Sequence, residues 1–317
     1  MDKIRVGVVG VGYLGQFHAE KYAHMEGVEL VGVVDIDSPR AKEVAKRYRS
    51  GPFFHHADLF SKVQAVSIAV PTLLHYSITK DFFLQGTDVL LEKPISNTLD
   101  EADELIQLAE SKGLIFQVGH LERFNGALSA SEEFIQSPLY IESHRLTPFP
   151  GRGTDVNVVL DLMIHDIDIL LSLVKSKVKK IDAVGIPILT PSSDIANARI
   201  EFENGCVANL TASRVSKEKT RRTRIYLSNG TLSIDYLSQK ASFSKRVDPS
   251  RRDKIPEIVT EEISVKKVDS LETEIHSFIR SVRTRNPARV SGWDGKRALE
   301  MALEIIQKIG EGLEKKK

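Results

Sequence analysis

The segment IRVGVVGVGYLGQFHAE (residues 4–20) decides the fold of this chain. It begins with a short apolar run, Ile4–Val9, and passes into a stretch with helical spacing that starts at Tyr13. A GxGxxG triplet between a strand and a helix, with an acidic residue about twenty positions later, is typical of a dinucleotide-binding turn. Asp35 stands at that distance, at the end of the next apolar run. The glycines of the triplet are Gly10, Gly12 and Gly15.

Each glycine has its own physical task in such a turn. Gly10 permits the tight turn, Gly12 lets the backbone approach a pyrophosphate, and Gly15 lets the helix pack closely on the strand. The helix N-terminus then presents unpaired N–H groups and a partial positive charge to the phosphates. We expect Tyr13 and Leu14 to contact the cofactor as part of the same turn.

Asp35 decides between the two nicotinamide cofactors. Its carboxylate can accept hydrogen bonds from both ribose hydroxyls and would repel a 2′-phosphate, which favours NAD. Arg40 is close enough in sequence to leave NADP open.

The bulk composition limits the class of protein. The 317 residues exceed the usual size of one hydrophobic core, so we expect two domains. A net charge of +1 provides no field to attract nucleic acid, and no apolar run approaches the ~20 residues of a membrane-spanning helix. Cys206 is the single cysteine, so no internal disulfide can form, which fits the cytoplasm.

The order of elements predicts an α/β fold with two parts. Residues 1–120 alternate apolar runs of strand length with helical stretches, which indicates a Rossmann domain with a doubly wound parallel sheet. The expected strands are Ile4–Val9, Glu29–Asp35, Ala65–Val70, Asp88–Glu92 and Ile115–Val118, and the expected helices are Tyr13–His24, Pro39–Tyr48, Leu73–Gln85 and Leu99–Ser111.

Residues 121–317 predict an α+β domain with a largely antiparallel open sheet. A long helix over Val156–Val174 precedes strands joined by tight turns, where Asn204-Gly205 and Asn229-Gly230 are expected to supply positive φ angles. The polar stretch Ala241–Glu257 predicts an exposed excursion, and the terminal lysine run a solvated tail. Two helices, Ser270–Arg283 and Asp294–Leu313, are expected to close the chain.

A second motif follows the fifth strand, in VLLEKP (residues 89–94). It places Glu92 and Lys93 at the carboxyl edge of the sheet, where open α/β sheets bind ligands. Out of context, a lysine at this place is usually only solvated.

Several stretches together resemble the glucose-fructose oxidoreductase, inositol dehydrogenase and rhizopine catabolism family (Gfo/Idh/MocA). They are GVVGVGYLGQFHA, AVPTLLHYSIT, DVLLEKPISNTLDEADEL, LETEIHSFIRSV and VSGWDGKRALE. The resemblance implies a Rossmann domain, a C-terminal domain whose sheet forms an oligomer interface, and a homo-oligomer, either dimer or tetramer. It implies that Lys93 reaches the substrate, that Glu92 and His75 lie near the nicotinamide ribose, and that Lys93-Pro94 is a cis peptide. We also expect Val70 and Thr72 to contact the cofactor.

The predicted helix VVLDLMIHDIDILLSLV (residues 158–174) is apolar almost all round, which indicates burial. Asp161, His165 and Asp168, spaced i, i+4, i+7, are expected to share one side of it. Buried groups of this kind must face a site or a paired network. A structural histidine satisfied by an aspartate is the alternative, and without a third ligand at a recognisable spacing we expect no metal. The resembling family carries a similar Asp-x-x-x-His pair facing the nicotinamide, which favours catalysis.

The pKa values of free side chains assign the catalytic roles. Oxidising an alcohol needs a base, and an unperturbed histidine has a pKa of ~6.5 against ~10.4 for lysine. Holding Lys93 neutral at pH 7 costs about 4.6 kcal/mol unless burial supplies it. We therefore expect His165 to be the base, Lys93 to be a cation that orients the hydroxyl and stabilises an alkoxide, and Asp161 to orient the imidazole or share the substrate contact.

The stretch GHLERFN (residues 119–125) follows the last Rossmann strand and contributes further substrate candidates. Arg123 can clamp a phosphate or carboxylate, or tie domains together, and Asn125 is expected beside it. This stretch, with GTDVNVVLDLMIHDID (residues 153–168), looks similar to family members that oxidise the C3 hydroxyl of UDP-N-acetylglucosamine. Many relatives have a glycine run where this chain has Asp155–Val158, which leaves the substrate contacts of that stretch open.

An arginine cluster lies around a predicted hairpin: Arg214, Arg221, Arg222 and Arg224. It could receive a diphosphate, and a solvated or oligomer-facing edge strand is the alternative. Cys206 is interpreted as a small strand residue rather than a nucleophile.

The sequence thus predicts an NAD-dependent dehydrogenase acting on a hydroxyl of a sugar or nucleotide sugar. The alternatives are another sugar or polyol dehydrogenase, a carbonyl reductase, or a non-catalytic dinucleotide-binding redox sensor.

Overall fold

The computed structural model describes residues 2–149, 156–247 and 257–314. It divides into two compact units, which we call the N-terminal unit (residues 1–121 and 269–299) and the C-terminal unit (residues 122–268 and 300–317). The first boundary lies next to the predicted division after residue 120. The difference is that residues 269–299 belong with the N-terminal unit rather than with the second domain.

The N-terminal unit contains a six-stranded parallel sheet in the order β3-β2-β1-β4-β5-β6. This order reverses direction between β1 and β4, and ligands bind at that switch point, beyond the carboxyl ends of the strands. The predicted doubly wound Rossmann sheet is confirmed. Its strands are β1 (Ile4–Val9), β2 (Val28–Val34), β3 (Gly51–Phe53), β4 (Ala65–Ile68), β5 (Asp88–Glu92) and β6 (Phe116–Gly119).

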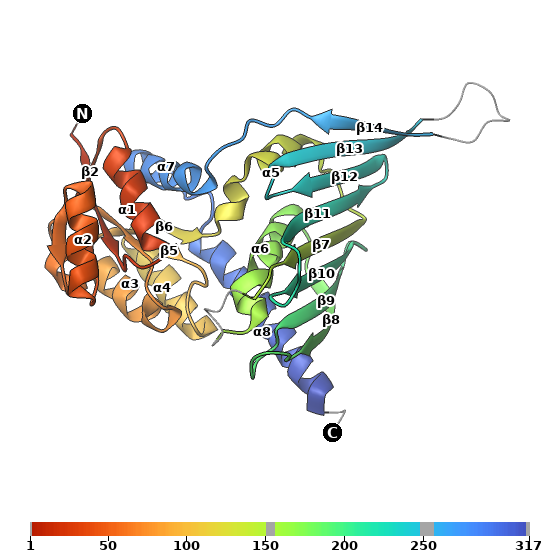
Figure 1. The fold of residues 1–317 in the computed structure, drawn as a ribbon, viewed down its shortest axis with the longest axis horizontal. Helices are drawn as coiled ribbons and strands as arrows, with labels where there is room; N and C mark the ends of the chain where they lie inside the picture. The colour runs from red at the N-terminus through yellow and green to blue at the C-terminus, as the bar shows by residue number, and fades with distance from the viewer. Residues whose placement is uncertain (1, 150–155, 248–256, 315–317) are drawn as a thin grey trace. The chain divides into compact units, whose positions relative to one another are not determined.

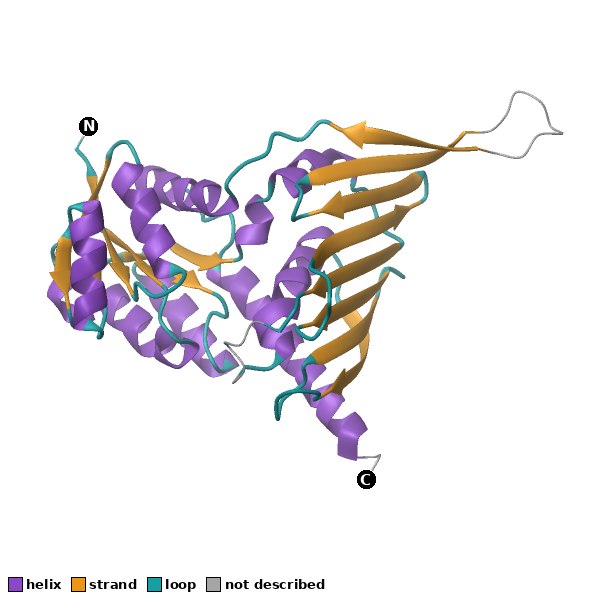
Figure 2. Cartoon of the chain, in the orientation of Figure 1, coloured by secondary structure: helices purple, strands orange, loops and turns teal. Residues whose placement is uncertain are grey.

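Helices connect these strands and lie on both sides of the sheet (Figure 2). Asp37 caps one of them by accepting a hydrogen bond from the Arg40 N–H, and Thr98 and Glu101 form a capping box at another. The helix predicted from Tyr13 begins at Gly15, and a short 3-10 turn, Thr72–Leu74, precedes the third helix. The helices are α1 (Gly15–His24), α2 (Ser38–Tyr48), α3 (His75–Leu84) and α4 (Leu99–Ser111).

Helix α7 (Ser270–Thr284) explains why a late segment belongs to the N-terminal unit. One of its faces carries Ile275, Phe278, Ile279 and Val282, which share a buried cluster with β1, β2 and α1. After the helix, the Arg285 guanidinium donates to both carboxylate oxygens of Asp88, at 2.5 and 3.1 Å. The apolar face and this ion pair hold the segment on the Rossmann sheet.

The C-terminal unit contains an eight-stranded sheet in the order β14-β13-β12-β11-β7-β10-β9-β8 (Figure 1). Every neighbouring pair is antiparallel except β7 with β10, so the predicted largely antiparallel sheet is confirmed. Its strands are β7 (Tyr140–Leu146), β8 (Val178–Ile186), β9 (Ile195–Phe202), β10 (Val207–Ser213), β11 (Thr220–Leu227), β12 (Gly230–Asp235), β13 (Lys240–Val247) and β14 (Glu257–Ile263).

Helices α5 (Gly126–Ser131) and α6 (Ile164–Leu173) lie on one face of this sheet (Figure 1). A π-helical turn, Val159–Met163, leads into α6, so the predicted single regular helix over Val156–Val174 is wrong at its start. Helix α8 (Gly292–Glu314) is divided between the units after Leu299. The part of the chain that the structure describes places no helix over the opposite face of the sheet.

Two predictions about the second half need correction. Of the four turn residues Asn204, Gly205, Asn229 and Gly230, Gly205 alone has a positive φ, at 86°. Gly230 is instead the first residue of β12, where a Cβ would lie 2.5 Å from the Ser244 carbonyl oxygen. The predicted excursion Ala241–Glu257 begins as strand β13, whose Ala241 and Phe243 are buried, because their neighbours on β12 supply a packed face. Residues 248–256 and the lysines at 315–317 lie outside the described residues.

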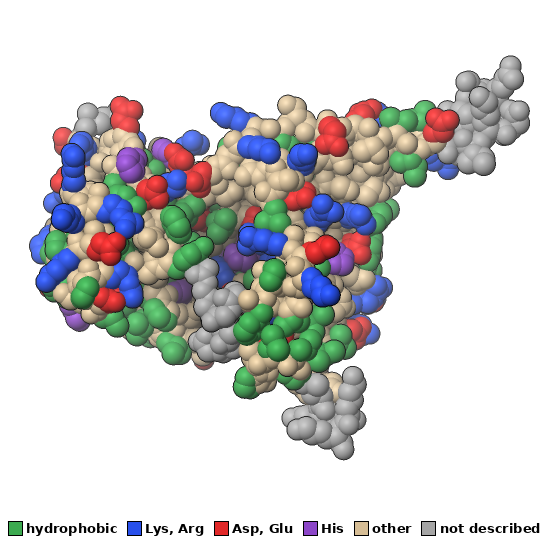
Figure 3. Space-filling model, viewed as in Figure 1, with side chains coloured by type: hydrophobic (Ala, Val, Ile, Leu, Met, Phe, Trp, Pro, Cys, Tyr) green, Lys and Arg blue, Asp and Glu red, His purple; other side chains and the backbone are tan. Residues whose placement is uncertain are grey.

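Acidic and basic side chains are interspersed over the face of the molecule that Figure 3 shows. Among the described helices, none has the length and apolar character needed to cross a membrane.

Replacing Phe278 by Ala tests the role of α7. The ring is fully buried in the cluster that it shares with β1, β2 and α1, so we expect a loss of about 3–5 kcal/mol in the stability of the N-terminal unit, seen as a lower first melting transition. Leu84→Ala is the control, because Leu84 is half exposed and should shift the transition little. Equal shifts for the two variants would contradict the assignment of α7 to this core.

Candidate active site and cofactor site

The glycine turn separates into two packed positions and one open position. A Cβ on Gly15 would lie 1.8 Å from the Gly10 carbonyl oxygen, and Gly10 itself has a φ of +81° with the Ala69 carbonyl 2.7 Å from its hypothetical Cβ. Gly12 differs, because a Cβ there would meet no heavy atom within 4 Å. Two of the glycines are therefore required by the protein itself, and Gly12 faces space that a ligand can occupy.

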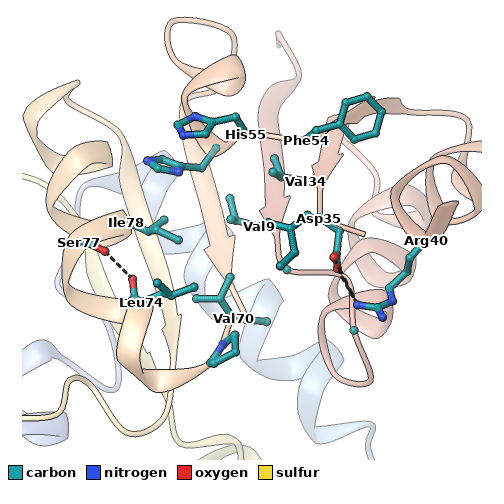
Figure 4. A pocket seen from close by; sticks show the side chains of 16 residues that line it. Val9, Val34, Asp35, Arg40, Phe54, His55, Val70, Leu74, Ser77 and Ile78 are labelled. Carbon is teal, nitrogen blue, oxygen red and sulfur yellow. Dashed lines mark hydrogen bonds and ion pairs between the residues drawn. The ribbon is translucent and has the colours of Figure 1, made fainter. Parts of the chain in front are cut away.

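A cavity of about 530 Å³ opens beside this turn, at the carboxyl ends of β1, β2 and β4 (Figure 4). Its wall is mostly apolar, with Asp35 and Arg40 at one side. The lining residues are Val9, Gly10, Gly12, Val34, Asp35, Ile36, Arg40, Phe54, His55, His56, Ala69, Val70, Pro71, Leu74, Ser77 and Ile78.

Asp35 is fixed by the backbone of the turns around it. Its Oδ2 accepts from the Val11 N–H at 3.0 Å, and its Oδ1 accepts from the Asp37 N–H at 2.9 Å. Arg40 Nη1 lies 3.3 Å from both carboxylate oxygens, and Arg40 Nη2 donates to Asp37 at 3.0 Å. Asp35 therefore holds a fixed carboxylate at the cavity, and the half-exposed Arg40 is held by two aspartates.

These features fit the adenosine and pyrophosphate parts of a dinucleotide. The open side of Gly12 allows close approach of a phosphate, the apolar wall suits a purine, and the Asp35 carboxylate can accept from ribose hydroxyls.

Phe54, His55 and His56 are among the residues of the cavity wall that were not predicted from the sequence. They follow β3, a strand of three residues that is too short to be recognised by its pattern. His56 Nε2 lies 2.8 Å from an Asp81 carboxylate oxygen, and His55 caps a short 3-10 turn. Both histidines thus have local structural partners as well as a place at the cavity.

Glu92 ends β5 and is almost fully buried. Its Oε1 lies 3.0 Å from Nε2 of the buried His18, a residue of α1 that sequence reasoning missed. A Cβ on Gly119 would come within 3.0–3.1 Å of the Glu92 carboxylate, so only glycine fits there without displacement. The signal for His18 was its position one turn beyond Gly15, on the face of α1 that packs inward.

The predicted cis peptide between Lys93 and Pro94 is confirmed. The Pro94 carbonyl oxygen lies 2.7 Å from Nδ1 of His75, and the Val70 carbonyl oxygen lies 2.9 Å from its Nε2. Burial lowers the pKa of His75, although both carbonyls act in the opposite direction. His75 therefore links the ends of β4 and β5 as a buried imidazole.

In the C-terminal unit, the candidate polar residues of the α6 region differ in burial. Asp161 lies in the π-helical turn and His165 in the first turn of α6, and both are half-buried. Asp168 is buried and accepts from Arg123 Nη1 at 3.3 Å. Asp161 and His165 thus remain partly accessible, whereas Asp168 belongs to an ion pair.

Asn125 has a structural role in the same unit. Its Oδ1 accepts from the Ala127 N–H at 3.1 Å and caps α5, and its amide nitrogen donates to Glu122 and to the Tyr236 carbonyl. These bonds hold the side chain in place inside the unit, where it is 3% exposed.

The structure divides the predicted arginine cluster. Arg214 is fully buried and donates to Asp194 at 2.8 Å. Burial raises the pKa of the Asp194 carboxyl, but three backbone N–H groups and Arg214 outweigh this effect and hold the pKa well below its usual range. Arg222 and Arg224 alternate with Arg221 along β11, which pairs with β7 and β12, so the edge-strand interpretation is wrong. The arginines therefore lie in three separate environments: Arg214 is buried, Arg221 lies on one face of β11, and Arg222 and Arg224 lie on the other.

Two further observations concern other chemistries. Burial raises the pKa of the Cys206 thiol to about 11, as suits a packed strand-end residue. Within the described ranges, no cluster of three or more His, Cys, Asp or Glu side chains is arranged to hold a metal ion.

A Rossmann unit with a dinucleotide cavity, joined to a second unit that carries a half-buried Asp-x-x-x-His pair, defines a two-domain nicotinamide-dependent oxidoreductase. Comparison with known families agrees. Residues 4–120 match "Oxidoreductase family, NAD-binding Rossmann fold", and residues 136–233 match "GFO/IDH/MocA C-terminal domain". The chain therefore belongs to the Gfo/Idh/MocA family and is an NAD-dependent dehydrogenase. These matches confirm the predicted family resemblance and the predicted cofactor.

Individual relatives extend over nearly the whole chain. UDP-N-acetylglucosamine 3-dehydrogenase of Acidithiobacillus ferrooxidans is 37% identical over 306 residues, 96% of this chain and 97% of the relative. A solved structure of that enzyme has a TM-score of 0.91, with 98% of each chain covered and 35% identity. Scyllo-inositol dehydrogenase from Lactobacillus casei, solved with NAD(H) and scyllo-inositol, has a TM-score of 0.80 at 20% identity, covering 97% of each chain, and shares the fold.

Replacing Asp35 by Ser tests the basis of cofactor preference. The change removes the acceptor for ribose hydroxyls and frees Arg40 from one of its two carboxylates, so we expect NAD to bind about tenfold more weakly and NADP more tightly than in the parent. The measurement is the dissociation constant of each cofactor by calorimetry. Asp37→Ser is the matched control, since serine can still cap α2 and Asp35 remains. An unchanged NAD to NADP ratio in Asp35→Ser would show that Asp35 does not set the preference.

Proposed function

We propose that this dehydrogenase oxidises the C3 hydroxyl of UDP-N-acetylglucosamine to the 3-keto sugar, with NAD as the hydride acceptor. The observation that carries the proposal is the 37% identity to a UDP-N-acetylglucosamine 3-dehydrogenase over almost the full length of both chains. Other family members share this fold at about 20% identity and act on inositols, so the fold alone does not choose the substrate.

The proposed cofactor site lies in the N-terminal unit. The pyrophosphate binds at the glycine turn, which consists of Gly10, Gly12, Tyr13, Leu14 and Gly15. Asp35 accepts hydrogen bonds from the adenosine ribose. Val70 and Thr72 follow β4, and His75 and Glu92 hold the region at the ends of β4 and β5, where the nicotinamide ribose is proposed to bind. When bound, NAD supplies the acceptor for the hydride that leaves C3.

Three side chains of this chain do the remaining chemistry in the proposal. The His165 imidazole takes the proton from the C3 hydroxyl as the C–H bond breaks, so that the hydroxyl becomes a carbonyl. Lys93 stays protonated, donates to the substrate oxygen and stabilises its developing negative charge. Asp161 orients the imidazole or the substrate, which is consistent with its half-buried place one turn before His165. Arg123, although paired with Asp168, keeps further guanidinium donors for an anionic group of the substrate.

We also propose a cytoplasmic homo-oligomer, dimer or tetramer, that assembles through the C-terminal sheet. The face opposite α5 and α6 carries exposed Val184 and Ile186 on β8, and the Tyr140 and Tyr226 rings lie 5.4 Å apart across β7 and β11. Apolar and aromatic side chains on an uncovered sheet face are typical of protein contacts. A single buried cysteine suits a reducing compartment.

Replacing His165 by Ala tests the catalytic assignment. Loss of the general base should lower kcat with UDP-N-acetylglucosamine by about 10²–10⁴-fold while the NAD dissociation constant stays near that of the parent. NADH formation is followed by absorbance. His144→Ala is the control, because His144 lies on β7 with half of its surface exposed and pairs with Glu142. Near-normal turnover of His165→Ala would contradict the assignment.

A substrate panel tests the sugar itself. We expect the highest kcat/KM with UDP-N-acetylglucosamine, a lower value with UDP-glucose, which lacks the acetamido group, and none with free inositols, which lack the diphosphate. Oxidation of scyllo-inositol without oxidation of the nucleotide sugar would instead identify a polyol dehydrogenase. No turnover with any of them would favour the sensor alternative.

A further inference from the structure

A buried network of charged side chains lies between β7 and α6, the helix that carries His165. It was not predicted from the sequence, and it has no part in the reaction proposed above. Arg145, on the central strand β7, is 2% exposed. Its Nε donates to Asp166 Oδ2 at 2.8 Å, its Nη2 to Asp166 Oδ1 at 3.1 Å, and its Nη1 to Glu122 Oε1 at 2.9 Å. The guanidinium thus joins α6 to the segment that precedes α5.

Residues of the sheet also donate hydrogen bonds to the two carboxylates of this network. The Ser143 hydroxyl, two residues along β7, donates to Asp166 Oδ1 at 2.9 Å, and Arg221 on β11 donates to Glu122 at 3.1 Å. Burial acts against the charged forms of Arg145 and Glu122. The nearby carboxylates instead raise the pKa of Arg145, and the two arginines lower the pKa of Glu122. Two arginines and two carboxylates thus face one another in this network.

The position of this network around the helix matters for His165. Asp166 and Asp168 point about 160° apart around the axis of an α-helix, and His165 lies between them on this shorter arc. Asp166 is held by Arg145 and Asp168 by Arg123. Arg123 follows Glu122 in the chain, so both anchors of α6 lead to the same short segment, Leu121–Phe124. Rotation of the helix in either direction would break one charged contact.

We propose that Arg145 is a positioning residue for the dehydrogenase reaction: through Asp166 and Glu122 it fixes the rotation of α6 and thereby the direction of the His165 imidazole. The inference rests on the proposed role of His165 as the base. A buried ion pair adds little net stability compared with apolar residues of the same size. Fixing a catalytic side chain requires instead a rigid, directional link, which the planar fork of arginine provides.

The test uses Arg145→Met and Asp166→Asn in the full-length enzyme. We expect kcat to fall by about 10²-fold in Arg145→Met, the loss that a displacement of about 1 Å causes, with KM for the nucleotide sugar and the NAD dissociation constant changed less than about threefold. Asp166→Asn keeps the side-chain size if Arg145→Met fails to fold, and should lose about tenfold. Arg145→Lys restores the charge without the fork and should recover only part of the rate.

The pH profile supplies a readout that a purely structural role would not move. The charged groups beside His165 in the described part of this unit are Asp161, Asp166 and Asp168 along the helix region, and Arg123, Arg145 and Glu122 packed against it. Arg145→Met leaves an excess of negative charge, which should move the acidic limb of kcat/KM to higher pH, and Asp166→Asn should move it to lower pH.

Arg222→Met is the matched control, because Arg222 lies on β11 with 63% of its side chain exposed and pairs with Asp235. It should leave kcat and the pH profile unchanged. Lower melting temperatures for Arg145→Met and Asp166→Asn, with kcat of the folded protein and the acidic limb as in the parent, would overturn the inference. An active His165→Ala would instead defeat the proposed function on which the inference rests.

Discussion

The close contact between the start of α1 and the end of β1 is the constraint on which the N-terminal unit depends. Gly15 lies so near the Gly10 carbonyl that no Cβ could stand between them. This contact brings the N-terminus of α1 to the carboxyl edge of the sheet, next to the cavity and the Asp35 carboxylate. The helix dipole, the open side of Gly12 and the acceptor for ribose hydroxyls therefore meet in one place.

The N-terminal fold could be predicted because its signals are local. Parallel strands buried on both faces are continuous apolar runs, and the glycine spacing with Asp35 defines the turn between them. Strand β3 and the histidines after it were not predicted, because a strand of three residues is too short to show a periodic pattern. Helix α7 was expected as a helix, but its place in the N-terminal unit depends on the buried cluster that Phe278 shares with β1, β2 and α1, which are distant in sequence.

In the C-terminal unit the predicted elements were mostly correct, whereas the prediction of a single arginine cluster on an edge strand was wrong. Arg214, Arg221, Arg222 and Arg224 are neighbours in the sequence, yet alternation along β11 and the Asp194 ion pair assign them to different surroundings. Arg145 stands at a position where strand alternation puts a side chain inside, which is the one signal that could have revealed the buried network. Its partners, Glu122 and Asp166, come from separate segments that only the folded sheet brings together. The proposed base, His165, was predicted from the sequence by residue type and spacing, whereas the residues proposed to position it are found only from their contacts.

In the proposed reaction, hydride leaves C3 of a UDP-linked N-acetylhexosamine and is transferred to bound NAD. The most direct test is a single turnover of the enzyme with UDP-N-acetylglucosamine that carries deuterium at C3, followed by mass spectrometry of both products. We expect the deuterium in the reduced nicotinamide and none of it in the keto sugar. Retention of deuterium in the sugar, with unlabelled NADH formed, would place the oxidation at another carbon and contradict the proposed reaction.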